Sequence, residues 1–291
     1  MASGSGQVMA RWLAPTETDE LRPLRLGLSL LGLLFVAASF IPYHGFDLYA
    51  YWVVHVDPYA PIANDAYGYG AFRYAPPMVV LMTPLGFLPW EAVIVGWLVL
   101  QLACLWYIGR SWALALVLFP PVWLDIVYGN INILLAAMIV AGFRSPAVWS
   151  FALITKITPG VGLIWFLVRR EWRALAQVAL ATALLVLGSI LVLGVGAWME
   201  WFAIVLNRSS VVIPSDALSI PFLPRAIAAA LIVAWAAWTD RRWLVPVGVT
   251  LAMPLLWAIA FAPLVACWAL VPPATAERIR ARVRARGTGI S

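Results

Sequence analysis

A polar stretch between residues 43 and 77 gathers side chains of the kinds that carry out acid–base chemistry. It holds seven of the nine tyrosines, both histidines and three aspartates. Helical spacing would place Asp47, Tyr51 and His55 on one face, at i, i+4 and i+8. A carboxylate beside such rings suits a general base, and Tyr49 adds a further ring for a sugar or an acceptor. The alternative is that Asp47 only caps a helix N-terminus, and the spacing does not separate the two.

The only lysine of the chain, Lys156, lies inside an apolar segment, whereas the other basic residues are 18 arginines. A charged side chain at the bilayer centre costs at least about 2.5–3.5 kcal/mol, so we expect this lysine to face a cavity or a partner. Its ammonium could donate hydrogen bonds to the phosphate of a lipid carrier. Thr155, Thr158 and Pro159 beside it favour such a site over the alternative, in which the lysine snorkels to an interface.

Further polar residues lie near the predicted outer ends of membrane segments. Asn130 and Asn132, in a turn over residues 128–132, could hydrogen-bond sugar hydroxyls or simply satisfy helix ends. Asp125, just before this turn, is a second acid or a capping group. Three outer arginines could meet a phosphate, or could anchor the chain at the interface: Arg73, Arg208 and Arg225.

The composition places these residues in a membrane protein. Hydrophobic residues make up 64% of the chain and charged residues only 11%, and the mean hydropathy is +0.93. Soluble domains average about 25% charged residues, so we predict an all-α polytopic membrane protein. The net charge of +6 comes from arginine clusters between apolar segments. This pattern is typical of cytoplasmic loops that face membrane lipids, and it does not indicate nucleic acid. The Ala, Arg and Trp bias favours a bacterial plasma membrane.

The arginine positions predict how the chain crosses the membrane. Arg22 and Arg25 flank the start of an apolar segment over 24–42, so this start faces the cytoplasm and the polar stretch that follows faces outward. We expect one transmembrane domain over 23–272, between a disordered cytoplasmic tail (1–22) and a basic cytoplasmic tail (273–291). Its outer loops are 43–77 and 198–219, and the second begins with an interfacial helix. The other apolar segments are 78–88, 91–109, 112–128, 130–143, 174–195 and 220–238.

Two apolar segments begin and end beside arginines, so both of their ends should lie on one side. The first runs from Arg144 to Arg169 and is too short to cross twice. We predict two half-helices, 147–155 and 158–168, which meet near Lys156; the alternative is one helix kinked at Pro159. The second, 243–271, should turn near residues 253–254. The predicted bundle therefore has about ten membrane helices, several of them short or broken.

Short motifs follow one another in a recognisable order. They are Asp47-Leu48-Tyr49-Ala50-Tyr51, Asp57-Pro58-Tyr59, Phe72-Arg73-Tyr74-Ala75-Pro76-Pro77, Pro84-Leu85-Gly86, Gly129-Asn130-Ile131-Asn132, Lys156-Ile157-Thr158-Pro159 and Asn207-Arg208-Ser209-Ser210. Over roughly residues 24–225 this order resembles the bacterial polyprenol-phosphate-mannose-dependent α-mannosyltransferases, which have the GT-C fold. The family's Gly-Gln-x-Asn motif is Gly-Asn-Ile-Asn in this chain.

The resemblance implies a glycosyltransferase that moves mannose, or a related sugar, from a polyprenyl-phosphate carrier to an extracytoplasmic lipid or glycan acceptor. In that family the aspartate after the first helix is the catalytic base, and the Lys-x-x-Pro lysine lies near the donor phosphate. These residues match Asp47 and Lys156, and an outer arginine such as Arg73 or Arg208 would assist the lysine. Inversion is expected. The acidic residues form no DxD cluster, so we expect no metal and no other cofactor.

Two other functions remain open at this point. A flippase or transporter of lipid-linked sugars, or a non-catalytic membrane subunit, would explain broken helices and a buried lysine. It would explain an outer aspartate among tyrosines less easily. A transferase of the same fold could also use another sugar, such as a glucosyl or arabinofuranosyl group.

Overall fold

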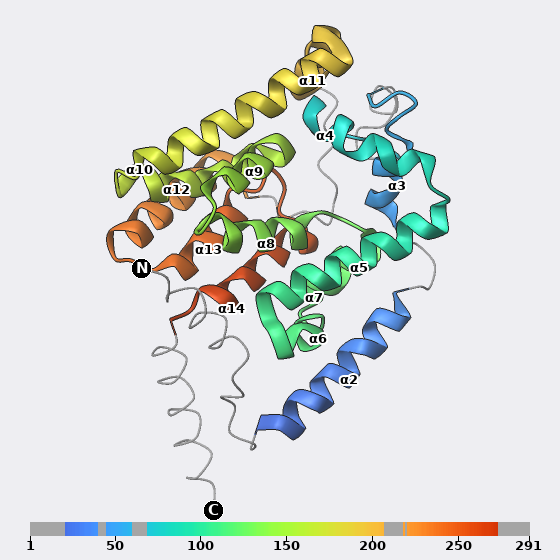
Figure 1. The fold of residues 1–291 in the computed structure, drawn as a ribbon. Coiled ribbons are helices and arrows are strands. Elements are labelled where there is room, and N and C mark those ends of the chain that lie inside the picture. Colours follow the sequence, from blue (N-terminus) through green and yellow to red (C-terminus); the bar gives the residue numbers. More distant parts are fainter. Residues whose placement is uncertain (1–20, 40–44, 60–68, 207–217, 219, 273–291) are drawn as a thin grey trace, which may run out of the picture.

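The computed structural model describes residues 21–39, 45–59, 69–206, 218 and 220–272. Every regular element in these ranges is an α-helix or a 3-10 helix, as the composition predicts. Arg208, the rest of the outer loop after residue 206 apart from Leu218, and nearly all of both predicted tails lie outside the described residues. The all-helical, strongly apolar architecture confirms a polytopic membrane protein (Figure 1).

The described helices follow one another with short connections. Those before the first predicted hairpin are α2 (Arg22–Ala38), α3 (Phe46–Val53), α4 (Pro76–Met82), η3 (Thr83–Phe87), α5 (Trp90–Gly109), η4 (Arg110–Trp112), α6 (Ala113–Leu116), α7 (Pro120–Tyr128), α8 (Asn132–Gly142) and η5 (Pro146–Val148). The remainder are α9 (Trp149–Lys156), η6 (Thr158–Leu163), α10 (Ile164–Val168), α11 (Trp172–Leu206), α12 (Phe222–Trp238), η8 (Arg242–Leu244), α13 (Val245–Leu251), η9 (Ala258–Val265) and α14 (Ala266–Leu270).

Few of these helices are long enough to cross a bilayer alone. Two stretches in the described residues have the length and hydropathy, Trp90–Leu116 and Trp172–Leu206, and α7 with α8 makes a third if the two are taken as one span bent by 116°. The remaining apolar helices are shorter, as expected for broken elements. Several have proline at their first or second position, where its missing N–H donor interrupts no helix but prevents continuation from the preceding segment.

Two segments have boundaries that differ from the prediction. The segment 112–128 was expected to be one helix, but the chain breaks at Phe119, because Pro120 disfavours helical backbone in the residue before it. The outer loop was expected to begin at 198 with a helix. The structure contains that helix as the outer part of α11, beyond a break at Gly194 with φ 80° and ψ 170°.

The segment around Lys156 folds back on itself, which confirms the predicted pair of half-helices. α9 ends at Lys156, and Ile157 has a φ of 52°, outside the helical region. A Cβ added to Gly162 would collide with the Trp149 ring, so the start of α9 lies against η6. A continuous helix would separate these two residues by about 20 Å. The alternative of one helix kinked at Pro159 is therefore wrong.

The last apolar segment also forms a hairpin, as predicted. α13 is the first arm of the hairpin. The chain turns between Leu251 and Ala258, and η9 and α14 return beside α13 as the second arm. Arg225, near the start of α12, holds the turn by donating to the carbonyl oxygens of Leu251, Met253 and Pro254 at 2.8–3.2 Å. The buried guanidinium therefore stabilises this turn, and its donors are not directed at a phosphate.

Basic residues meet at one end of the bundle, which we call the basic end. Arg169 donates to the Ala237 carbonyl at 3.3 Å and to Asp240 at 3.0 Å, so α10 and α12 finish side by side. Arg242 lies over the Phe143 ring, at 5.4 Å, where α8 finishes. The ends of α8, α10 and α12, which the arginine pattern assigns to one side of the membrane, therefore lie close together.

Candidate functional site

The site is built where α3 rests on the turn between α7 and α8. Gly129 has a φ of 67°, and a Cβ there would lie 2.6 Å from the Cβ of Leu48. Glycine is thus required both by the backbone conformation and by the close approach. The Gly45 N–H donates to the Val127 carbonyl at 2.7 Å, which fixes the first turn of α3. These contacts bring Asp47 to the residues that follow Gly129.

Asp47 accepts a hydrogen bond from the side chain of Asn130, with 2.8 Å between Oδ2 and Nδ2. The Asn130 Oδ1 accepts the N–H of Ile131 at 2.7 Å, so the amide has a fixed orientation. Asp47 does not cap α3 by a side-chain hydrogen bond. Desolvation raises the pKa of the Asp47 carboxyl above its ordinary value, and the Asn130 hydrogen bond and the charge of Lys156 oppose this rise.

Lys156 joins the same group of residues from the end of α9. Its Nζ donates to the Asn132 Oδ1 at 2.7 Å, so the lysine is held inside the protein and does not snorkel to an interface. Asn132 is fully buried, and its Nδ2 donates to Asp125 and to the Ile259 carbonyl. The turn after Gly129 therefore carries one asparagine on the carboxylate of Asp47 and another on the ammonium of Lys156.

Asp125 serves mainly to hold this turn. Its carboxylate is fully buried and accepts the N–H of Ile133 at 3.0 Å and the Asn132 amide at 2.9 Å. The buried Gln101 donates to the carbonyls of Asp125 and Asn130 at 3.1 and 3.0 Å. Of the two roles considered for Asp125, the geometry is that of a cap on α8. Gln101 was missed by sequence reasoning, although a glutamine inside an apolar segment is a signal that could have been used.

Four of the tyrosines form a hydrogen-bonded pair and a stacked pair. The Tyr51 and Tyr74 hydroxyls lie 2.9 Å apart, and the Tyr59 hydroxyl donates to the Tyr74 carbonyl at 3.1 Å. Desolvation raises the pKa of both Tyr51 and Tyr74, which keeps them neutral. Tyr49 is half-buried and stacks on Tyr69 with 4.1 Å between ring centroids. Tyr49 thus has an accessible edge for a ligand, whereas Tyr51 supports α3 from within.

His55 lies away from this group, contrary to the prediction of a shared face. α3 ends at Val53, so the helical register does not reach residue 55. The His55 side chain is exposed, its Nδ1 is 3.0 Å from the Trp52 carbonyl, and its ring lies near Phe87. The physical reason is the close contact with Gly86, which accommodates the imidazole where a Cβ would collide with it.

Of the arginines expected at the donor phosphate, only Arg73 can be placed near the site. It is half-buried between Phe72 and Tyr74, and its carbonyl accepts the Trp201 indole N–H at 3.2 Å. The outer part of α11 is thereby attached to the tyrosine-rich segment. Arg208 lies outside the described residues.

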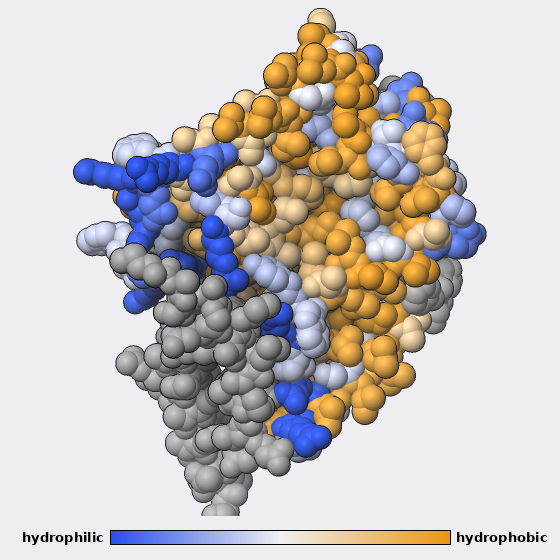
Figure 2. All heavy atoms as spheres, in the orientation of Figure 1, coloured by the Kyte–Doolittle hydropathy of each residue, from blue (hydrophilic) through white to orange (hydrophobic). Residues whose placement is uncertain are grey.

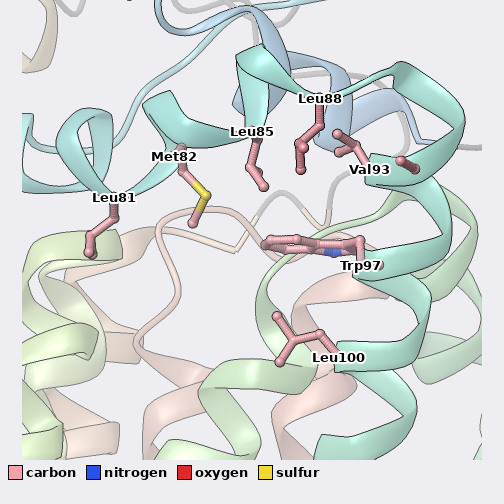
Figure 3. A pocket seen from close by; sticks show the side chains of 9 residues that line it. Leu81, Met82, Leu85, Leu88, Val93, Trp97 and Leu100 are labelled. Atoms are coloured by element: carbon pink, nitrogen blue, oxygen red, sulfur yellow. The ribbon is translucent and has the colours of Figure 1, made fainter.

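An apolar pocket of about 390 Å³ opens between α4–η3 and α5 (Figure 3). Leucines 81, 85, 88 and 100 contribute to its wall, with Trp97 between them. Trp97 also packs against Tyr51, with 5.3 Å between ring centroids, so one ring separates the pocket from the helix that carries Asp47. Its buried indole N–H has no hydrogen-bond partner among the described residues. Sequence reasoning found the short apolar piece 78–88 but not this pocket.

The site therefore combines, in a helical membrane protein, a half-buried carboxylate, an internal ammonium and an adjacent apolar pocket. The chain belongs to glycosyltransferase family 87, whose family model matches residues 72–285, about three quarters of its 291 residues. The match includes Lys156 and both asparagines, whereas Asp47 precedes it. No curated protein and no solved structure matches the chain.

Proposed function

We propose that this glycosyltransferase moves mannose from a polyprenyl-phosphate carrier to a hydroxyl of an extracytoplasmic lipid or glycan acceptor. The observation that carries the proposal is the turn after Gly129. It places Asn130 on Asp47 and Asn132 on Lys156, and so connects a base to a cation through two fixed side-chain amides. A transfer of this kind requires a proton acceptor for the nucleophile and a positive charge for the leaving phosphate.

Asp47 suits the role of base because its side chain is only partly buried. Desolvation raises the pKa of its carboxyl, which makes it a stronger proton acceptor, while the hydrogen bond from Asn130 and the charge of Lys156 lower that pKa. Asn130 also occupies one carboxylate oxygen, which orients the other toward a ligand. In the proposed step, Asp47 takes the proton of the acceptor hydroxyl as its oxygen attacks the anomeric carbon. The carbon–oxygen bond to the phosphate breaks, and the configuration inverts.

Lys156 suits the phosphate because an ammonium has three N–H donors and only one is engaged within the described residues. The other two are available to oxygens of the departing polyprenyl phosphate, on which negative charge develops. Arg73, or Arg208, would supply a second positive charge. The apolar pocket beside Trp97 has the chemistry to hold the first isoprene units of the carrier.

Family membership favours transfer over the flippase or subunit alternatives, and the remaining question is which sugar is moved. The test is to supply purified protein with radiolabelled mannosyl, glucosyl and arabinofuranosyl polyprenyl phosphates and a bacterial lipid extract. We expect transfer from the mannosyl donor, an α-linked product, and unchanged turnover in the presence of EDTA. Preference for another donor would refute the mannose assignment, and no transfer from any lipid-linked donor would refute the carrier assignment.

A further inference from the structure

A second hollow, of about 640 Å³, lies at the basic end, and none of the residues of the transfer site lines it. Arg144 and Pro146, the latter at the start of η5, form one side, and the α10–α11 turn with the first residues of α11 forms the other. Arg170, Arg173 and Gln177 line this second side. We call it the basic hollow. Figure 2 shows hydrophilic side chains gathered at the left margin, where α10 and α11 meet in Figure 1.

The positive charge of the basic hollow is not balanced by its one acidic residue. Glu171 lines the hollow, but its carboxylate accepts from Arg169 at 2.9 Å. Arg169 is held in turn by Asp240 at 3.0 Å. The side chains of Arg170 and Arg173 make no hydrogen bond or ion pair with any residue that the structure describes. An anion that entered the hollow would therefore meet two guanidiniums whose donors are available.

The backbone of the turn is held in a conformation that ordinary residues rarely adopt. Arg170 has a φ of 57°, and the N–H of Glu171 donates to the Phe166 carbonyl at 2.9 Å. A non-glycine residue in this region costs roughly 1–3 kcal/mol and persists only where the surroundings impose it. The bonds of Arg169 to the end of α12 are such surroundings. The turn is thus a fixed frame for Arg170 and Arg173 and not a loosely placed loop.

Apolar side chains beside the hollow indicate an anion that carries a lipid tail. Trp172, which lines the hollow, is 60% exposed, and Leu167 of α10 is 50% exposed. The α11 surface that continues from the hollow is almost entirely unburied and strongly apolar. Indole rings favour the headgroup level, and basic pockets between membrane helices bind anionic headgroups. A soluble anion would bind the arginines but would leave these apolar surfaces without an apolar partner.

We propose that the basic hollow binds the headgroup of an anionic phospholipid, with its phosphate between Arg170 and Arg173 and its acyl chains along α11. The volume is within the range of sites for small organic molecules. The binding is independent of the transfer reaction, since none of these residues takes part in the site at Asp47. The lipid comes from the leaflet that contains the basic end.

The test counts lipids bound to the purified protein by native mass spectrometry after titration with phosphatidylglycerol, cardiolipin or phosphatidylcholine. The pocket variant is Arg170→Gln with Arg173→Gln, which keeps side-chain length. The matched control is Arg22→Gln with Arg110→Gln, which removes the same charge outside the hollow. We take each of the two arginines to stabilise the bound lipid by as much as one basic residue near an anionic membrane surface. The pocket variant should then bind anionic lipid about 30-fold more weakly.

We expect the wild type and the control to bind the anionic lipids equally well. Phosphatidylcholine should bind all three proteins to the same extent. Equal weakening in the pocket variant and the control would show general charge attraction and would overturn the proposal. Competition by glycerol phosphate as strong as that by the lipids would show a soluble anion site and would also overturn it. If the double variant does not fold, Gln177→Glu, which adds a negative charge on the exposed surface of α11, should weaken anionic lipid binding several-fold; unchanged binding would refute the site.

Discussion

The Asn130 amide donates to the Asp47 carboxylate at 2.8 Å, although 83 positions separate the two residues in the chain. The contact exists because Gly129 lets the α7–α8 turn approach Leu48 with no side chain between them. A base on the short helix α3 is thereby held to the centre of the bundle.

Replacement of Asp47 tests the proposed base. Asp47→Asn keeps the shape and the contact with Asn130 but cannot accept a proton, so transfer should fall about 10²- to 10⁴-fold with little change in thermal stability. Radiolabelled mannose transfer by the purified variant measures this. The matched control is Asp57→Asn, an exposed aspartate of the same stretch, which should retain full activity. More than about a tenth of wild-type turnover in the Asp47 variant would mean that another group is the base.

The pH profile should show the influence of Asn130. Asp47 acts only when ionised, so activity should be lost as the pH falls through its pKa, and this acid limb should lie above the ordinary value of 3.8. Hydrogen bonding from Asn130 lowers the pKa of Asp47. Asn130→Ala should therefore move the acid limb to higher pH, beyond any loss of rate at the optimum. A lower rate with an unmoved limb would assign Asn130 to substrate binding instead.

Lys156 should determine the affinity for the carrier phosphate. Lys156→Ala should weaken binding of sugar-free polyprenyl phosphate about 10- to 100-fold, the usual range for a hydrogen bond to a charged group. Lys156→Arg should restore only part of the affinity, because a planar guanidinium does not replace a compact ammonium. Titration in detergent with Arg22→Gln as the charge control measures both. Equal affinities for all four proteins would leave Arg73 or Arg208 as the phosphate ligand.

Gly129 should be intolerant of any side chain. Gly129→Ala places a methyl group 2.6 Å from the Leu48 Cβ at a φ of 67°, so we expect a loss of about 1–3 kcal/mol and a displaced Asp47. Gly188→Ala is the control, since nothing lies within 4 Å of its added Cβ in the helix α11. Thermal unfolding in detergent and transfer assays should separate the two variants. Equal stability would mean that the α3 contact is loose.

The membrane topology also follows from the arginines. Both termini should lie in the cytoplasm, with Asp47 on the outer side. Cysteines introduced singly at Ser5 and Thr288, in a background without Cys104 and Cys267, should resist labelling by a membrane-impermeant maleimide in intact cells and react after lysis. Reaction in intact cells would place the proposed base on the cytoplasmic side and would exclude an extracytoplasmic acceptor.

Much of the architecture could be predicted because membrane insertion depends on simple properties. Apolar length, proline and arginine position located the fold-back at Lys156 and the hairpin that turns after Leu251. These features depend on local sequence, since proline removes a backbone donor and an arginine resists burial in hydrocarbon. Residues 130 and 132 were recognised as polar groups at a boundary for the same reason.

The pairings within the site could not be predicted, because they depend on tertiary contacts. Spacing assigned His55 to the face of Asp47, but α3 ends two residues earlier and the ring packs on Gly86. Arg225 was a possible phosphate ligand, yet its donors serve the carbonyls of a distant turn. Whether a polar side chain faces a ligand or a backbone group is decided by which elements meet, and a single sequence does not reveal this.

The fold-back at Lys156 has a consequence for how the protein depends on its bilayer. α9 has eight residues and rises about 12 Å, less than half of the roughly 30 Å hydrocarbon thickness. None of these residues is exposed, so protein and not lipid surrounds the short element. The hairpin is thereby shielded from the mismatch that a short lipid-facing helix would cause. The position of Lys156 relative to Asp47 is then set by the protein alone, so turnover should depend little on the acyl-chain length of the surrounding lipids.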